Sequence, residues 1–228
     1  DDGFDPAAHG WLDEDDSPAG PALRDDELRA AHSTLTVPRP PRDFRAVVKA
    51  LHRRTTSKVL FNNPRQKFLL DAWTLAEFAI RLKSADRAWL SGPGDQWPDG
   101  YVRVGGATKN VEVTIADMPG RKMGEEYRTD GGIEFDPAED WAARADAIPQ
   151  ALETAIRKKG AKRYASGIWL VIYLNLNDYG IRQTQTELII GQRVSHSFRD
   201  SSRARLSRAA GRIRPELWTA APADFFLT

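Results

Sequence analysis

Apolar side chains recur at helical spacing in two stretches of the N-terminal half of the chain. In residues 43–54 they predict a short amphipathic helix with one apolar face. In the second stretch, Asn63 is a suitable N-cap and Pro64 a suitable first residue for a longer helix. Apolar residues then dominate from Phe68 to Leu82, and the helix is expected to end there.

Alternating and continuous apolar runs predict strands further along. Tyr101–Val104 and Val111–Ala116 are expected to form a hairpin across the five residues 105–109. A weaker strand signal precedes them at Arg87–Leu90. The run Ile168–Leu174 is almost entirely apolar, which is typical of a central strand covered on both faces.

The element order places this chain in the α/β class. Helical signals resume at Asp136-Pro137 and, past Pro149, run to about Tyr164. The order is therefore helix, strand, strand, strand, helix, strand. At 228 residues the chain has the length of one domain with a tail. Residues 1–35 lack periodicity and predict an acidic tail or arm, which leaves 36–228 as a single domain.

Composition excludes several classes of protein. No apolar run is long enough for a transmembrane helix. With no Cys, disulfides, a thiolate nucleophile and Cys-ligated zinc are excluded, which favours a reducing, cytoplasmic location. The four His residues show no metal-binding spacing, and neither a Walker-type loop nor a nucleophile elbow is present. The chain begins Asp1-Asp2 without Met, so we expect a fragment of a longer protein.

Charge is distributed unevenly although the net charge is only +1. Residues 1–30 hold ten Asp or Glu and two Arg, a net charge of −8, which leaves +9 for the rest. Residues 151–215 hold thirteen Lys or Arg against four acidic residues. A basic body predicts an anionic partner, with nucleic acid first, although a solvated basic helix face is an alternative. The acidic arm could compete with that partner, dock on another subunit or a second copy in a homodimer, or be inert.

Glu77 lies within the apolar stripe of the predicted 68–82 helix, four residues after Trp73. An isolated buried carboxylate is too costly, so Glu77 must be paired, protonated or bound to a cation. Pairing with Arg81 or Lys83 at the edge of the stripe is one alternative. A functional site is the other.

Two further carboxylates belong to the predicted hairpin. Asp99 opens its first strand directly after Pro98, where a turn-forming Asp before Gly100 is the ordinary alternative. Glu112 lies mid-strand among β-branched neighbours, where Glu is disfavoured. Its alternative is a solvent-facing position on a half-exposed strand.

These carboxylates fall in a known arrangement. The segments Trp97-Pro98-Asp99 and Glu112-Val113-Thr114, between a Glu-bearing helix and a Lys-rich helix, resemble the PD-(D/E)xK nuclease superfamily over roughly residues 64–176. The resemblance implies a restriction-endonuclease-like core with a mixed central sheet flanked by helices. The run from Glu112 through Pro119-Gly120-Arg121 to Glu126-Tyr127-Arg128 is also similar to that of uncharacterised bacterial proteins.

The resemblance to this superfamily further implies a metal-dependent nuclease that cleaves DNA with a metal-activated water. It implies Asp99, Glu112 and Glu77 as side-chain ligands of Mg²⁺ or Mn²⁺, with Val113 as a ligand through its backbone carbonyl. Hard oxygen ligands of this kind suit Mg²⁺ and Mn²⁺ better than zinc.

The sequence departs from the superfamily motif at one position, because Thr114 stands where the motif has Lys. Some members carry this Lys on the following helix, and Lys159 is the candidate. It stands seven residues after Leu152 and three after Ile156, on the apolar, sheet-facing stripe, where a Lys is otherwise hard to explain. The alternative is a solvated basic run, residues 157–163.

Several other basic residues are candidates for contacts with the nucleic-acid backbone: Lys158, Lys162, Arg163, Arg121 and Lys122. Two rival functions stay open. One is a catalytically degenerate nuclease fold that binds nucleic acid or a protein partner without cleavage, with Thr114 as its symptom. The other is an interaction protein whose acidic arm and basic body assemble with copies of itself.

Overall fold

The computed structural model describes residues 23–56, 59–60, 63–95, 97–117, 138–160, 168–175 and 225–227. Its N-terminal half contains the helices α1 (Asp25–Leu35), α2 (Pro41–His52), the short 3-10 helix η2 (Pro64–Gln66) and α4 (Lys67–Arg81). The rest contains β1 (Ala85–Leu90), β2 (Gly100–Val104), β3 (Ala107–Asp117), α6 (Ala138–Gly160), β4 (Ile168–Asn175) and β5 (Phe225–Leu227). The α/β class is therefore confirmed, with the order helix, three strands, helix, strand from α4 to β4.

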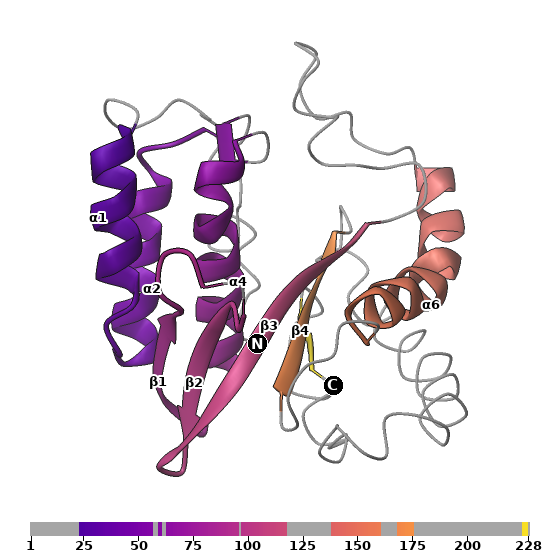
Figure 1. Ribbon diagram of the computed structural model, residues 1–228. Helices are drawn as coiled ribbons and strands as arrows, with labels where there is room; N and C mark the ends of the chain where they lie inside the picture. The colour runs from indigo at the N-terminus through magenta and orange to yellow at the C-terminus, as the bar shows by residue number, and fades with distance from the viewer. Residues whose placement is uncertain are drawn as a thin grey trace, which may run out of the picture.

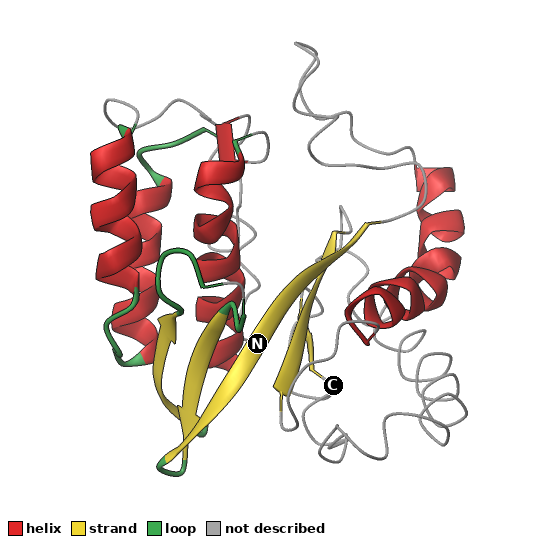
Figure 2. Cartoon of the chain, viewed as in Figure 1, coloured by secondary structure: helices red, strands yellow, loops and turns green. Residues whose placement is uncertain are grey.

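The strands form one mixed sheet in the order β1-β2-β3-β4-β5 (Figure 2). β2 pairs antiparallel with both β1 and β3, and β4 pairs antiparallel with β5. β3 and β4 run parallel, from the pair Asn110 and Ile168 to the pair Asp117 and Asn175. A parallel pair needs a crossover connection, and α6 lies within the one between β3 and β4.

Helices cover the sheet from two sides, with α1, α2 and α4 on one side and α6 on the other (Figure 1). Val111 and Val113 of β3 join the core cluster formed with α4. Successive strand residues point to opposite faces, so Glu112 points to the other face, where α6 packs on β3 and β4. Val171 and Ile172 of β4 are both fully buried, which confirms a strand covered on both faces.

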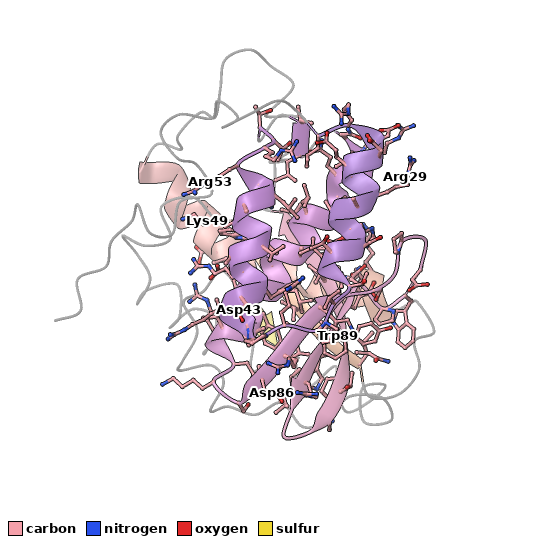
Figure 3. The ribbon with its side chains drawn as sticks, turned by 90° about the vertical axis from the view of Figure 1, so that its left-hand side faces the viewer. Arg29, Asp43, Lys49, Arg53, Asp86 and Trp89 are labelled. Atoms are coloured by element: carbon pink, nitrogen blue, oxygen red, sulfur yellow. The ribbon has the colours of Figure 1, made fainter. Side chains whose placement is uncertain are left out.

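The predicted helices at residues 43–54 and 68–82 correspond to α2 and α4. The amphipathic pattern of α2 is confirmed, because Phe44 and Val48 are fully buried. Its outer side carries the exposed Asp43 and Lys49, and the exposed Arg53 follows its last residue (Figure 3).

The start of α4 and the hairpin turn differ in detail from the prediction. Asn63 caps η2, which precedes α4, and its side chain accepts a hydrogen bond of 3.0 Å from the Arg65 N–H. The hairpin turn is shorter than predicted, because only Gly105 and Gly106 form it and residues 107–109 belong to β3. Their φ angles of +57° and +79° suit a two-residue turn that glycine adopts at low cost.

The predicted tail of residues 1–35 extends too far, because residues 25–35 form α1. Leu28, Ala31 and Leu35 of this helix are buried. Acidic residues in the first turn favour a helix because they face its positive end. The acidic composition of this segment therefore led to the prediction of a tail where the chain forms the amphipathic helix α1. Residues 1–22 lie outside the described residues, as do Arg121, Lys122, Lys162, Arg163 and residues 176–224. None of the described helices is long and apolar enough to cross a membrane.

Candidate functional site

Asp99 lies directly before β2, and its side chain is hydrogen-bonded to β3. Its Oδ2 accepts a hydrogen bond of 2.7 Å from the backbone N–H of Val113. Gly100, next to it, is buried under α4, and a Cβ at this position would lie 2.6 Å from Leu75 Cδ2 and 2.8 Å from the carbonyl oxygen of Trp89. Glycine therefore allows α4 to pack closely on β2, which holds the β-hairpin and Asp99 beside α4.

Glu112 and Lys159 meet on the α6 side of β3. Lys159 Nζ lies 2.7 Å from Glu112 Oε1 and donates a second hydrogen bond of 3.0 Å to the carbonyl oxygen of Val113. Only 14% of the Lys159 side chain and 4% of the Glu112 side chain are exposed. Thr114, two residues after Glu112 on the same strand face, is half-buried. The structure thus brings Asp99, Glu112, Val113 and Lys159 together.

Sequence reasoning missed two residues beside this group, both in the first turns of α4. Lys67 Nζ lies 3.0 Å from Asp71 Oδ1 and 2.7 Å from Asp71 Oδ2. The Asp71 side chain is 14% exposed, and that of Lys67 is 64% exposed. The sequence contained one indication of this pair. A Lys in the first turn of a helix is unfavourable, because it faces the positive end of the helix dipole. A carboxylate four residues later can compensate for it.

The cluster is crowded with negative charge, and burial is the main cause of its pKa shifts. The pKa of Asp71 is raised to about 6, mainly by burial and also by the charge of Asp99, against the opposing effect of Lys67. Burial and the charge of Glu112 likewise raise the pKa of Asp99. The charge of Asp71, followed by those of Asp99 and Glu112, raises the pKa of Lys67 although burial acts against it. Three carboxylates therefore face two ammonium groups.

Glu77 does not join this group. It forms ion pairs with Arg45 of α2 and, at 3.8 Å, with Arg81 of its own helix. Only 8% of its side chain is exposed. The prediction that Glu77 converges with Asp99 and Glu112 is therefore wrong, because Glu77 contacts Arg45 of α2. Pairing with Arg81, the alternative considered above, is present. The decisive Arg45 comes from another helix.

Among the described residues, no group of three or more His, Cys, Asp or Glu side chains is placed to hold one metal ion. Asp99, directly before β2, and Glu112 on the adjacent strand β3 are a smaller, all-oxygen donor set. Mg²⁺ is commonly held by one or two carboxylates with waters and substrate phosphates. The two residues therefore fit such an ion. Comparisons of the chain with models of protein families, with curated proteins and with solved structures found no significant match.

Proposed function

We propose that this protein is a metal-dependent phosphodiesterase that cleaves DNA and has a restriction-endonuclease-like core. The observation that carries the proposal is the position of the Lys159 ammonium, 2.7 Å from Glu112. Thr114 cannot supply the positive charge that the superfamily motif places on β3. α6 delivers an ammonium to the same carboxylate from 47 residues further along the chain. The element order and the parallel pair of β3 and β4 also support this core.

Asp99 and Glu112 would hold the Mg²⁺ or Mn²⁺ ion. The crowding of Asp99 by Glu112, which raises the pKa of Asp99, is the electrostatic condition that a bound cation relieves. The Val113 carbonyl could complete the ligand set by giving up its hydrogen bond from Lys159. A bound ion of this kind activates water and neutralises charge on the scissile phosphate.

The other residues of the cluster have roles that follow from their contacts. Lys159 would stabilise the negative charge that grows on the phosphate in the transition state, because its ammonium is preorganised and largely shielded from water. Asp99 fixes the Val113 amide and so the local position of β3. Asp71 takes the place of Glu77 as the α4 carboxylate nearest to the site. Lys158, exposed on α6, would contact the DNA backbone.

The test is cleavage of DNA by the purified protein with Mg²⁺ or Mn²⁺. Asp99→Ala and Glu112→Gln should abolish cleavage while DNA binding stays equal or becomes tighter, since each change removes negative charge near phosphate. Lys159→Ala should reduce kcat by about 100-fold or more, as loss of a preorganised electrostatic group does.

Lys158→Ala is the matched control, because it removes the same charge from the neighbouring residue of α6. It should weaken affinity for DNA with kcat within about threefold, as expected of a backbone contact outside the chemistry. Cleavage that survives Asp99→Ala and Glu112→Gln, or that persists in chelator, would refute the proposal. Salt-sensitive DNA binding without any cleavage would instead identify a degenerate module.

A further inference from the structure

Lys67 and Lys159 approach the cluster from opposite layers and differ in their access to solvent. Lys159 comes from α6 and its side chain is 14% exposed. Lys67 comes from α4 and its side chain is 64% exposed. Lys67 is thus the more accessible ammonium group of the two.

The hydrogen bonds of Lys67 leave capacity for another acceptor. In the described part of the chain its ammonium donates to the two carboxylate oxygens of Asp71, at 3.0 and 2.7 Å. An ammonium has three donors, so one stays available for a further oxygen while the pair with Asp71 persists. An incoming anion does not need to break this pair.

The position of Lys67 on its helix is unfavourable by itself. It is the first residue of α4, at the positive end of the helix dipole, where a cation is disfavoured. The charges of Asp71, Asp99 and Glu112 all act to keep its ammonium protonated. The site therefore holds this cation in place although its helix position opposes it.

We propose that Lys67 binds a phosphate of the DNA strand adjacent to the phosphate at Asp99 and Glu112, and that Asp71 positions the Lys67 ammonium for this contact. The inference rests on the proposed function and extends it by defining where the strand crosses α4. The DNA backbone would pass over the start of α4 on its way to the cluster of Glu112 and Lys159. Lys67 contributes to binding of the substrate, whereas Lys159 contributes to the chemical step.

The experiment compares Lys67→Ala with Lys83→Ala. Lys83 is an exposed lysine just past the other end of α4, and the 15-residue helix is about 22 Å long. Binding of a short labelled DNA duplex is measured by fluorescence anisotropy at several salt concentrations, with Ca²⁺ in place of Mg²⁺. The slope of log K against log salt should become smaller by about 0.9 for Lys67→Ala, the loss of one phosphate contact. Lys83→Ala should leave the slope unchanged.

A second pair of measurements separates binding from chemistry. With Mg²⁺, Lys67→Ala should raise KM by about 10-fold with kcat within about threefold, as expected when only ground-state binding is lost. Lys67→Arg should restore the salt slope, since it keeps the charge, and Lys67→Gln replaces Lys67→Ala if the latter does not fold. Circular dichroism establishes that each variant is folded.

Each outcome bears separately on the two proposals. An unchanged salt slope for Lys67→Ala, or equal losses for Lys67→Ala and Lys83→Ala, would overturn the assignment of Lys67 and leave the phosphodiesterase proposal standing. Absence of DNA binding by the unaltered protein would overturn the assignment of Lys67 as well. A reduced slope for Lys67→Ala in a protein that never cleaves DNA would support the Lys67 contact and reject the phosphodiesterase.

Discussion

The first and second halves of α4 each carry a carboxylate with little exposure to solvent, and their surroundings are opposite. Asp71 pairs with Lys67 and is influenced by Asp99 across the site. Glu77 pairs with Arg45 and Arg81 and contacts α2. Six residues along a helix amount to a rotation of about 600°, so the two carboxylates lie on different sides of α4. One side faces the strands that carry the candidate site, and the other faces α2.

The difference shows that burial of a carboxylate in an apolar stripe does not by itself indicate a functional site. At the centre of a stripe, a neighbouring helix can supply an arginine, and the pair is then part of the structure. A carboxylate that faces other carboxylates keeps their like-charge repulsion even when it is paired, as Asp71 is with Lys67. Asp71 and Asp99 both have raised pKa values because burial and like charge act in the same direction.

The largest effect on stability is expected at Glu77. Glu77→Ala leaves Arg45 and Arg81 without this carboxylate in a poorly solvated position. Breaking a buried ion pair in this way costs about 3–5 kcal/mol of the free energy of unfolding. Urea denaturation of the variant and the unaltered protein measures this loss, and DNA cleavage per folded molecule should not change.

Two results would contradict this assignment of Glu77. A loss below about 1 kcal/mol would mean that the ion pair is weak or solvated, as exposed pairs are. A folded Glu77→Ala protein without cleavage activity would mean that Glu77 belongs to the functional site. Arg45→Met serves as the companion variant, because it removes the partner on α2 and should destabilise the protein without affecting cleavage.

The next largest effect is expected at Asp71, and it depends on pH. The pKa of Asp71 is raised from 3.8 to about 6 in the folded protein, so the folded state binds this proton more tightly than the unfolded state. Stability from this group is therefore present at low pH and is lost as pH rises through about 6. Asp71→Asn removes the titration. Relative to the unaltered protein, it should gain about 1–3 kcal/mol between pH 4 and pH 7.5.

Denaturation curves at the two pH values measure this gain. Asp86→Asn is a control of opposite sign, because a hydrogen bond from Arg103 lowers the pKa of Asp86. That variant should lose stability relative to the unaltered protein only as pH rises through the region at and below 3.8, so between pH 4 and pH 7.5 its relative stability should change little. If Asp71→Asn has the same relative stability at pH 4 and 7.5, burial does not perturb Asp71 and the contrast with Glu77 disappears.

The sequence could predict the parts of the site that lie on strands. Alternation along residues 111–116 predicts that Val111 and Val113 share one face of the strand and that Glu112 lies on the other, and in the structure the two valines join the core cluster with α4. The position of Lys159 on the apolar stripe of α6 was enough to expect it near the sheet. In both cases the periodicity of the strand or helix determines which face a residue occupies, and that face packs against a single neighbouring layer.

The choice between Asp71 and Glu77 could not be made in this way. Helical periodicity places Glu77 in the stripe of α4, but it does not tell that α2 presents Arg45 to it. Tertiary packing between helices decides the partner. The same limit explains α1, whose acidic residues suggested a tail although Leu28 and Leu35 are buried by packing that only the fold reveals.

The smallest effect is expected at Glu153, which isolates burial as the variable. Glu153 and Arg157 of α6 have the same order and spacing as Glu77 and Arg81 of α4. Their side chains are 58% and 70% exposed, against 8% and 13% for the pair on α4. Solvent screens the exposed pair, so Glu153→Ala should change the free energy of unfolding by no more than about 0.5 kcal/mol.

The comparison with Glu77→Ala under the same urea conditions removes helix propensity as an explanation, since both substitutions exchange a helical Glu for Ala. A ratio of about 6 or more between the two losses is expected from exposed and buried ion pairs. Similar losses at both positions would show that local helix pairing, and not the contact of Glu77 with Arg45 of α2, sets the stability of these ion pairs.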